Sequence, residues 1–319
     1  MRRRILLLGL ATTAVVGMMI VTARGVAESE TKYPPVGQFI AADGVRLHYV
    51  RRGAGRPVVL LHGNPGSLED FERLIPALAT DHLVLAFDRP GHGHSERGAG
   101  DAGTPTRQAE LLHLALAALS ISQPILVGHS WGGSLALAYA LKYPGDLAAV
   151  VLAEGTAYAD GIRTSGTYAA IATPVLGQIM AATVLQPIAR SLINKGLVKA
   201  FSPGRVPPDY LVRASLMWSR PGDGRATAVD SIRRGQVMPE LTRHYAELQV
   251  PIVALASGQD ALTPAPGQAL RLHDELPACQ VIPVPSGGHM LAYTHPLVVA
   301  EAVRTAEAMS AAGGSARSR

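Results

Sequence analysis

Short apolar runs, each followed by a Gly or Asp turn, alternate with helical patterns along most of this chain. Continuous apolar runs of this length are typical of parallel strands that are buried on both faces. The runs are residues 57–61, 83–87, 124–127, 149–152, 251–255 and 280–283, and helical patterns lie at residues 107–118, 130–142, 265–275 and 296–309. This alternation predicts an α/β fold with a doubly wound, mostly parallel sheet.

Two segments depart from the alternation. Residues 37–41 and 46–50 flank Asp43-Gly44, a strong signal for a two-residue hairpin, so an antiparallel ribbon is expected at the start of the domain. Later, apolar helical stretches such as residues 175–198 follow one another without a strand. We therefore expect an α/β core at residues 37–155 and 246–310, a helical cap at residues 156–245, and a disordered tail at residues 311–319.

The N-terminus has the pattern of an export sequence. Three arginines precede an uncharged run at residues 5–23, and the small residues of Gly25-Val26-Ala27 follow it. Residues 1–27 are therefore expected to be either a cleaved signal peptide or a retained membrane anchor, and residues 28–36 a linker. Both alternatives place the domain that follows outside the cytoplasm, either free or anchored, with membrane association through residues 5–23.

Charge and cysteine content exclude several classes of partner and site. The formal net charge is +5, but Arg2, Arg3, Arg4 and Arg24 contribute four of these charges, so 5 − 4 = +1 remains for the rest of the chain. Such a small basic excess gives no reason to expect a nucleic-acid partner. Cys279 is the single cysteine, which excludes an intrachain disulfide and a cysteine-built zinc site.

One motif carries the candidate nucleophile. The segment Gly128-His129-Ser130-Trp131-Gly132 follows an apolar strand and opens an Ala/Leu-rich helix, which is the strand-turn-helix context that G-x-S-x-G requires. The turn is so tight that side chains at its glycines would collide with the neighbouring strand and helix. We therefore expect Ser130 to project its hydroxyl above the sheet edge.

A serine hydroxyl needs a base to take its proton, and that base needs an acid to orient it. In chain order the acid is expected after the serine and before the histidine. His289 follows the last predicted strand and is the candidate base. Asp260 follows the strand before it and is the preferred acid, with Glu154, at the end of an earlier strand, as the alternative.

Attack on a carbonyl creates an oxyanion, which needs two N–H donors. The backbone N–H of Trp131, next to the nucleophile, is one candidate. The other is the backbone N–H of Asn64, in the Gly/Pro-rich loop at residues 62–66.

Taken together, the hairpin, the loop at residues 62–66, the segment at residues 88–95, the serine motif, Asp260 and Gly288-His289 occur in an order that resembles the α/β-hydrolase superfamily. The resemblance spans residues 37–309 and fits its serine-nucleophile branch, which is esterase-like or lipase-like and carries a helical cap. It implies that the histidines of residues 88–95 belong to a structural loop.

Three neighbouring families resemble the chain less well. Asn64 and Trp131 match the halide-binding positions of haloalkane dehalogenases, but those enzymes carry an aspartate nucleophile, as do the epoxide hydrolases of this fold. Prolyl aminopeptidases carry a Gly-Gly-x-Pro-Gly turn where this chain has Gly63-Asn64-Pro65-Gly66.

The expected function is hydrolysis of a small hydrophobic carboxylic ester through an acyl-enzyme, without a metal or organic cofactor. An amidase or aminopeptidase, a lactonase, a carbon-carbon hydrolase and a perhydrolase would use the same triad, and a non-catalytic ligand-binding protein would keep the fold without it. Apolar cap residues are expected to line the substrate pocket, above all Met217 and Trp218, with Met180, Leu185, Ile188, Leu192 and Leu216. The oligomeric state is left open.

Overall fold

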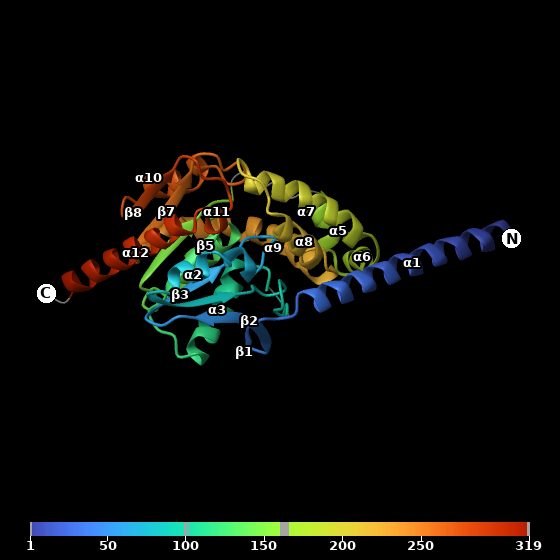
Figure 1. Cartoon of the computed structure of the whole chain (residues 1–319), viewed down its shortest axis with the longest axis horizontal. Helices are drawn as coiled ribbons and strands as arrows, with labels where there is room; N and C mark the ends of the chain where they lie inside the picture. The colour runs from blue at the N-terminus through green and yellow to red at the C-terminus, as the bar shows by residue number, and fades with distance from the viewer. Residues whose placement is uncertain (1, 99, 101, 160–165, 318–319) are drawn as a thin grey trace.

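An eight-stranded sheet forms the centre of the protein, which we describe from a computed structural model that covers residues 2–98, 100, 102–159 and 166–317 (Figure 1). The strand order is β1-β2-β4-β3-β5-β6-β7-β8, in which β1 and β2 are antiparallel to their neighbours and the strands from β4 onward are parallel. The strands are β1 Gln38–Ala42, β2 Val45–Arg52, β3 Arg56–Leu61, β4 His82–Phe87, β5 Ile125–His129, β6 Ala149–Ala153, β7 Ile252–Ser257 and β8 Cys279–Val284. The mostly parallel sheet expected from the apolar runs is confirmed.

Two hydrophobic cores cover the two faces of this sheet because successive side chains of a strand point to opposite faces. Val59 and Leu61 belong to one core, whereas Val58 and Leu60 belong to the other. Helices α3 Pro105–Ala118, α4 Trp131–Lys142 and α10 Ala269–Glu275 contribute to the first core. The second core is formed with η1 Leu68–Phe71, α2 Leu74–Leu78, α11 Leu291–Thr294 and α12 Pro296–Arg317. The short turn η4 Ala265–Gly267 precedes α10.

The hairpin at the start of the sheet has the geometry that its sequence predicts. Asp43 and Gly44 adopt φ angles of 47° and 73°, and Ala42 pairs with Val45. Positive φ at both central residues is the signature of a type I′ turn, which suits the right-handed twist of paired strands.

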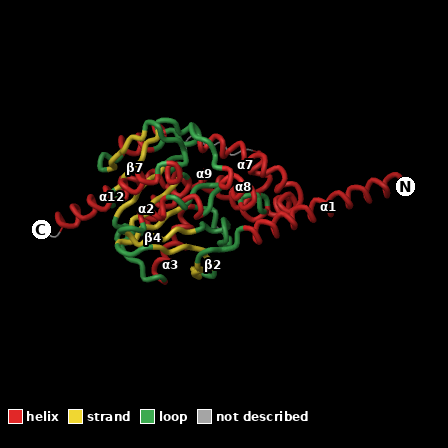
Figure 2. The backbone as a smooth tube through the Cα atoms, in the orientation of Figure 1, coloured by secondary structure: helices red, strands yellow, loops and turns green. Residues whose placement is uncertain are grey.

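Between β6 and β7 the described chain is helical and forms the cap. Its elements are α5 Gly166–Ala172, α6 Pro174–Met180, η2 Ala181–Leu185, α7 Gln186–Phe201, α8 Pro208–Met217, α9 Pro221–Leu241 and η3 Thr242–Glu247. These helices lie at one end of the sheet, on the side from which α1 extends (Figures 1 and 2). Residues 160–165 of the predicted cap lie outside the described residues.

The N-terminal segment differs from its prediction at the linker. Helix α1 runs from Arg2 to Lys32, so residues 28–32 are helical and only residues 33–37 connect it to β1. Pro34 is the first proline of the chain, and it is this residue that prevents continuation of the helix. Among the described residues, no helix combines the length and apolar character needed to cross a bilayer.

The C-terminal segment is helical where a disordered tail was expected. Helix α12 continues through residues 311–317 to Arg317, and residues 318–319 lie outside the described residues. Ala311 and Ala312 favour continuation of the helix because alanine has the highest helix propensity, whereas Gly313 and Gly314 oppose it.

Candidate active site

The turn that carries Ser130 is strained in the way the sequence predicts. Ser130 lies between β5 and α4 with φ 51° and ψ −121°, a conformation that non-glycine residues rarely adopt. A Cβ added at Gly132 would lie 2.1 Å from the carbonyl oxygen of Leu61, and one at Gly128 would lie 2.5 Å from the carbonyl oxygen of Gly132. Both glycines are therefore required by close approach of backbone to backbone.

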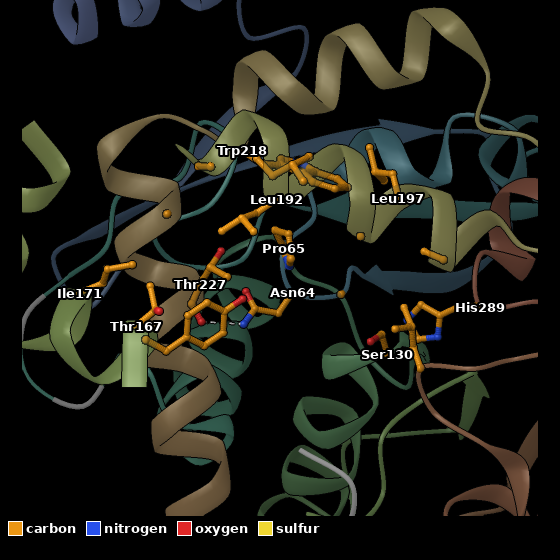
Figure 3. Close-up of a pocket in the computed structure, with 18 of the residues that line it drawn as sticks. Asn64, Pro65, Ser130, Thr167, Ile171, Leu192, Leu197, Trp218, Thr227 and His289 are labelled. Carbon is orange, nitrogen blue, oxygen red and sulfur yellow. Dashed lines mark hydrogen bonds between the residues drawn. The ribbon is translucent and has the colours of Figure 1, made fainter. Parts of the chain in front are cut away.

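The predicted base and acid come from loops that follow neighbouring strands. Asp260 lies after β7 and His289 after β8, and Nδ1 of His289 is 2.8 Å from Oδ2 of Asp260. Both side chains are buried. Figure 3 shows Ser130 beside the His289 ring at one end of the pocket that both residues line. The structure thus brings together the three residues of the expected triad.

Asp260 is held as an anion by its surroundings. Its Oδ1 accepts hydrogen bonds from the backbone N–H groups of Leu262 and Thr263, at 2.7 and 3.0 Å. The Thr263 hydroxyl donates to Oδ2 at 2.5 Å. Burial by itself raises the pKa of Asp260, but the hydrogen bonds from His289 and Thr263 outweigh burial and lower the pKa below its ordinary value. A charged Asp260 favours the His289 tautomer with hydrogen on Nδ1, which leaves Nε2 free to accept a proton.

Glu154, the alternative acid, lies next to Asp260 but in a different electrostatic environment. It is 4% exposed, and its Oε1 accepts the backbone N–H of Ser257 at 3.2 Å. Burial and the negative charge of Asp260 raise the pKa of Glu154 to about 9. A carboxyl group that is neutral at pH 7 cannot supply the charge that a histidine base needs, which favours Asp260 for that role.

Two positioning contacts were not anticipated from the sequence. His129, directly before the serine, is buried, and burial lowers its pKa to about 3, so its ring is neutral. Its Nε2 donates to the backbone carbonyl of His289 at 2.9 Å and thereby fixes the loop of the base. Thr263 contacts both Asp260 and Nδ1 of His289. A threonine three residues after the acid could have indicated the second contact, because Asp and Thr often cap turns together.

The side chains of the two oxyanion-hole candidates are bonded to the cap. Asn64 Nδ2 donates to the Thr227 carbonyl oxygen and the Ser231 hydroxyl, at 2.9 and 3.0 Å. Trp131 Nε1 donates to the Asp230 carbonyl oxygen at 3.3 Å. The two side-chain N–H groups that match the halide-binding positions of dehalogenases are thus engaged by helix α9. The backbone N–H of Trp131, at the first position of α4, has no acceptor within its own helix and so is available to an oxyanion.

The histidines of residues 88–95 take part in the internal bonding of the protein. His92 Nε2 bonds to Asn64 Oδ1 at 2.9 Å, so this ring helps to orient the oxyanion loop. Asp88 accepts bonds from His48 and from the backbone of Leu68 and His94. Among the described residues, no group of three or more His, Cys, Asp or Glu side chains is arranged to hold a metal ion.

A pocket of about 330 Å³ opens between the triad and the cap (Figure 3). Of the predicted lining residues, Met180, Leu185, Leu192 and Trp218 line it. Met217 and Leu216 are buried at the C-terminal end of α8 and are not among the lining side chains, and Met217 instead packs in the cap core with Tyr210. The side chain of Ile188 lies outside the described part of the chain. Further apolar lining residues that were not predicted are Ile171, Ala189, Ile193, Leu197, Ala200, Leu262 and Met290.

Comparison with known proteins identifies the family of the chain. A family profile described as "alpha/beta hydrolase fold" matches residues 56–296, and the chain belongs to this family. The chain is 30% identical over 208 residues to a 2-hydroxymuconate semialdehyde hydrolase of Pseudomonas sp. (strain CF600), which covers 63% of this chain and 73% of that protein. It is 34% identical over 119 residues to a cis-3-alkyl-4-alkyloxetan-2-one decarboxylase of Shewanella oneidensis, and this match covers 36% of this chain but only 37% of the relative.

Among solved structures, a thermophilic esterase from Thermogutta terrifontis is similar with a TM-score of 0.70 and 22% identity, over 86% of this chain and 99% of that chain. At this identity the likeness shows the fold alone. The protein is therefore a hydrolase of the α/β-hydrolase family, and its substrate has to be argued from the site.

Proposed function

We propose that the protein is a serine hydrolase that cleaves a hydrophobic carboxylic ester. The observation that carries the proposal is the 2.8 Å contact between His289 and Asp260 beside Ser130, at the end of an apolar pocket. A buried, charged acid that orients a histidine beside a serine on a strained turn is the arrangement that makes a hydroxyl nucleophilic.

In the proposed reaction, Ser130 Oγ attacks the carbonyl carbon and His289 Nε2 takes the hydroxyl proton. The resulting oxyanion is stabilised by the backbone N–H groups of Asn64 and Trp131. Collapse of the tetrahedral intermediate breaks the bond to the alcohol, which leaves with the proton from His289. Water then attacks the acyl-enzyme and His289 takes the proton of the water. When this second tetrahedral intermediate collapses, the bond to Ser130 Oγ breaks, His289 returns the proton to Oγ, and the carboxylic acid leaves.

The preference for a hydrophobic substrate follows from the pocket lining. Beyond the triad, the side chains that face the cavity are mostly aliphatic or aromatic, and most of them come from α5, α6, η2 and α7 of the cap and from Trp218, directly after α8. A cavity of this kind favours an alkyl or aryl group, since transfer of apolar surface from water into it is favourable.

Carbon-carbon bond hydrolysis is the second candidate. The relative from Pseudomonas sp., whose match covers 63% of this chain, is named a 2-hydroxymuconate semialdehyde hydrolase. A second relative, from Pseudomonas putida, is named a 2-hydroxy-6-oxo-2,4-heptadienoate hydrolase. The same serine, histidine and aspartate would serve either reaction. A substrate panel decides between them.

The proposal is tested with a fluorophosphonate probe and a substrate panel. We expect the probe to label the wild type, to fail on Ser130→Ala, and to label Ser215→Ala, which removes a hydroxyl on the cap surface that bonds to Asn194. The panel contains p-nitrophenyl esters of graded acyl length, matched amides, lactones, and vinylogous diketones for the carbon-carbon reaction. Folded wild-type protein that is neither labelled nor active on esters would contradict the proposal.

We also propose that the chain is exported, that its catalytic domain lies outside the cytoplasm, and that residues 5–23 associate with the membrane while α1 remains attached. Export rests on the sequence pattern alone, and retention of α1 is supported by the way its end packs on the cap. Thr22 Oγ1 donates to the Thr183 carbonyl oxygen at 3.2 Å, and Gly25 approaches the side chain of Gln186 so closely that a Cβ there would overlap it. Peptidase cleavage after Ala27 would remove both contacts.

This second proposal is tested on the full chain expressed in a bacterium. A reporter that is active only outside the cytoplasm, fused after Arg317, is expected to be active. N-terminal sequencing and carbonate extraction of membranes then give the state of α1. Protein that begins after residue 27 and is released by carbonate would contradict retention of α1, and an inactive reporter would contradict export.

A further inference from the structure

Arg89, two residues after the end of β4, is a buried cation that contacts the oxyanion loop on the side away from the pocket. It is 1% exposed, and its Nε donates to the His62 carbonyl oxygen at 3.0 Å. Its Nη2 donates to the Gly63 carbonyl oxygen at 2.8 Å. The Gly63 carbonyl and the Asn64 N–H belong to the same peptide group. A donor on that carbonyl therefore acts directly on the N–H proposed to bind the oxyanion.

A second donor reaches the same carbonyl. The backbone N–H of Arg89 donates to His62 Nε2 at 2.9 Å, so in the neutral ring the hydrogen must be on Nδ1, which lies 2.9 Å from the Gly63 carbonyl oxygen. Burial and the Arg89 charge lower the pKa of His62 to about 3, which keeps this ring neutral. Donors on a carbonyl withdraw electron density from the peptide group and make its N–H a better donor, the more so when one donor is charged.

The same guanidinium also contacts the indole ring of Trp131, the residue whose backbone N–H is the other proposed donor. The Cζ atom of Arg89 lies 4.0 Å from the centre of the Trp131 ring, in cation-π geometry. Trp131 and Asn64 are thus linked through one side chain that does not line the pocket. Arg89 is placed to polarise the Asn64 N–H directly and to hold the side chain of Trp131 in place, without touching the substrate.

The charge of Arg89 is balanced by the cap. Asp230, on α9 and fully buried, has Oδ2 2.7 Å from Arg89 Nη1 and Oδ1 2.6 Å from Arg97 Nη1. Gln108 and His92 also face this carboxylate, at 3.2 and 4.0 Å. Since the Asp230 carbonyl holds the Trp131 indole and the neighbouring Thr227 and Ser231 hold the Asn64 amide, about one turn of α9 bonds to every part of this assembly.

We propose that Arg89 is a positioning residue for the oxyanion hole and that Asp230 makes cap helix α9 a part of it. The inference rests on the proposed role of the Asn64 N–H as an oxyanion donor. It means that the cap does more than line the pocket, because seating of α9 determines how well the oxyanion is stabilised. The expected consequence is a loss in kcat, with KM little changed, when the pair is altered.

The primary test is Arg89→Lys, which keeps the charge but cannot donate to two carbonyls in a fixed fork. We expect kcat on the best ester to fall by about tenfold or more, with KM within about threefold. The matched control is Arg97→Lys, since Arg97 contacts the same carboxylate of Asp230 but donates to the Pro90 carbonyl rather than to the oxyanion loop. The control is expected to change kcat by less than about threefold. Wild-type kcat in Arg89→Lys would overturn the inference.

A double variant in which residues 89 and 230 are both uncharged distinguishes a positioning role of Arg89 from a role in stability alone. Asp230→Asn leaves the buried Arg89 charge uncompensated and is expected to lower the melting temperature. Arg89→Met/Asp230→Asn removes both charges, and we expect it to recover the melting temperature while kcat stays about tenfold to a hundredfold below wild type. Recovery of kcat together with stability would overturn the inference in favour of a purely structural pair.

A readout that needs no ester turnover keeps this test independent of the proposed substrate. The second-order rate of fluorophosphonate labelling also depends on the oxyanion hole, because the phosphoryl oxygen develops negative charge there. We expect labelling of Arg89→Lys to slow by about tenfold while Arg97→Lys labels at nearly the wild-type rate. Equal rates would overturn the inference even if esters are cleaved, whereas slowed labelling in a protein that cleaves no ester would overturn only the ester assignment.

Discussion

The Asp260 carboxylate and the His289 imidazole come from loops after adjacent strands, and their Oδ2 and Nδ1 atoms lie 2.8 Å apart. Adjacent parallel strands end at the same edge of a sheet, so residues far apart in sequence meet there. Glu154 follows β6, one strand further along the sheet, and its contact is the backbone N–H of Ser257. Strand order and protonation state together favour Asp260 over Glu154 as the acid that orients His289.

Asp260→Asn is expected to lower kcat by about 10³-fold to 10⁴-fold, because an amide cannot hold the histidine in the required tautomer or stabilise its charged form. Glu154→Gln is expected to cost less than about tenfold, since the carboxyl it replaces is already neutral. Steady-state kinetics on the best ester of the panel give both values. The opposite ranking would transfer the role of acid to Glu154.

Glu154→Gln should also change how stability depends on pH. Burial and the Asp260 charge raise the pKa of Glu154 from 4.5 to about 9, so between these pH values the folded state binds more protons than the unfolded state. The stability of the wild type therefore falls as pH rises through this window. The variant has no such proton, and we expect it to gain about 1 to 3 kcal/mol on wild type at pH 8, with the gain vanishing near pH 4.

Urea unfolding at several pH values measures this effect. The control is Glu240→Gln, which alters an exposed carboxyl on α9 and is expected to show no such trend with pH. A stability difference between Glu154→Gln and wild type that is constant across the window would contradict the assignment of a neutral Glu154.

Gly132→Ala is expected to destabilise the protein by about 2 to 4 kcal/mol, because its Cβ would meet the backbone of Leu61 rather than a movable side chain. Gly235→Ala, inside helix α9, meets nothing within 4 Å and is expected to stabilise by about 0.5 to 1 kcal/mol. Urea denaturation monitored by circular dichroism compares the two. If both substitutions changed the free energy of unfolding equally, steric contact with Leu61 would not explain why a glycine is needed at position 132.

Trp218→Leu is expected to enlarge the pocket and to shift the preferred acyl chain toward greater length, since Trp218 is one of its largest lining side chains. Met217→Leu, at the adjacent position in the cap core, should leave the chain-length profile unchanged because the swap nearly conserves volume. The ratio of kcat/KM for long and short p-nitrophenyl esters reports the profile. If the chain-length profile changed in Met217→Leu but not in Trp218→Leu, the assignment of Trp218 to the pocket lining would be contradicted.

Much of the fold could be predicted because local patterns and the final structure agree. Each predicted strand overlaps one strand of the sheet, and Asp43-Gly44 forms its hairpin turn. The ends were less predictable. A linker was expected at residues 28–36 and a disordered tail at residues 311–319, whereas α1 continues to Lys32 and α12 to Arg317.

The candidate site likewise has features that could be predicted from local sequence and features that could not. The glycines around Ser130 and the chain order of serine, acid and histidine are local features, because a tight turn has the same steric demands wherever it occurs. Which of Met217 and Trp218 faces the pocket is not a local feature. They are neighbours in sequence and point about 100° apart around a helix, so only the packing of α8 against the core decides between them.

By itself, the amino-acid sequence determined the sheet, the cap and the identity of a serine, a histidine and two possible acids, since these depend on periodicity, turn chemistry and chain order. The tertiary structure alone decided that Asp260 contacts the histidine while Glu154 is buried as a neutral acid, and that Arg89 and Asp230 join the cap to the oxyanion loop. The physical reason is that desolvation and charge pairing depend on neighbours brought from distant parts of the chain, and a linear pattern does not contain those distances.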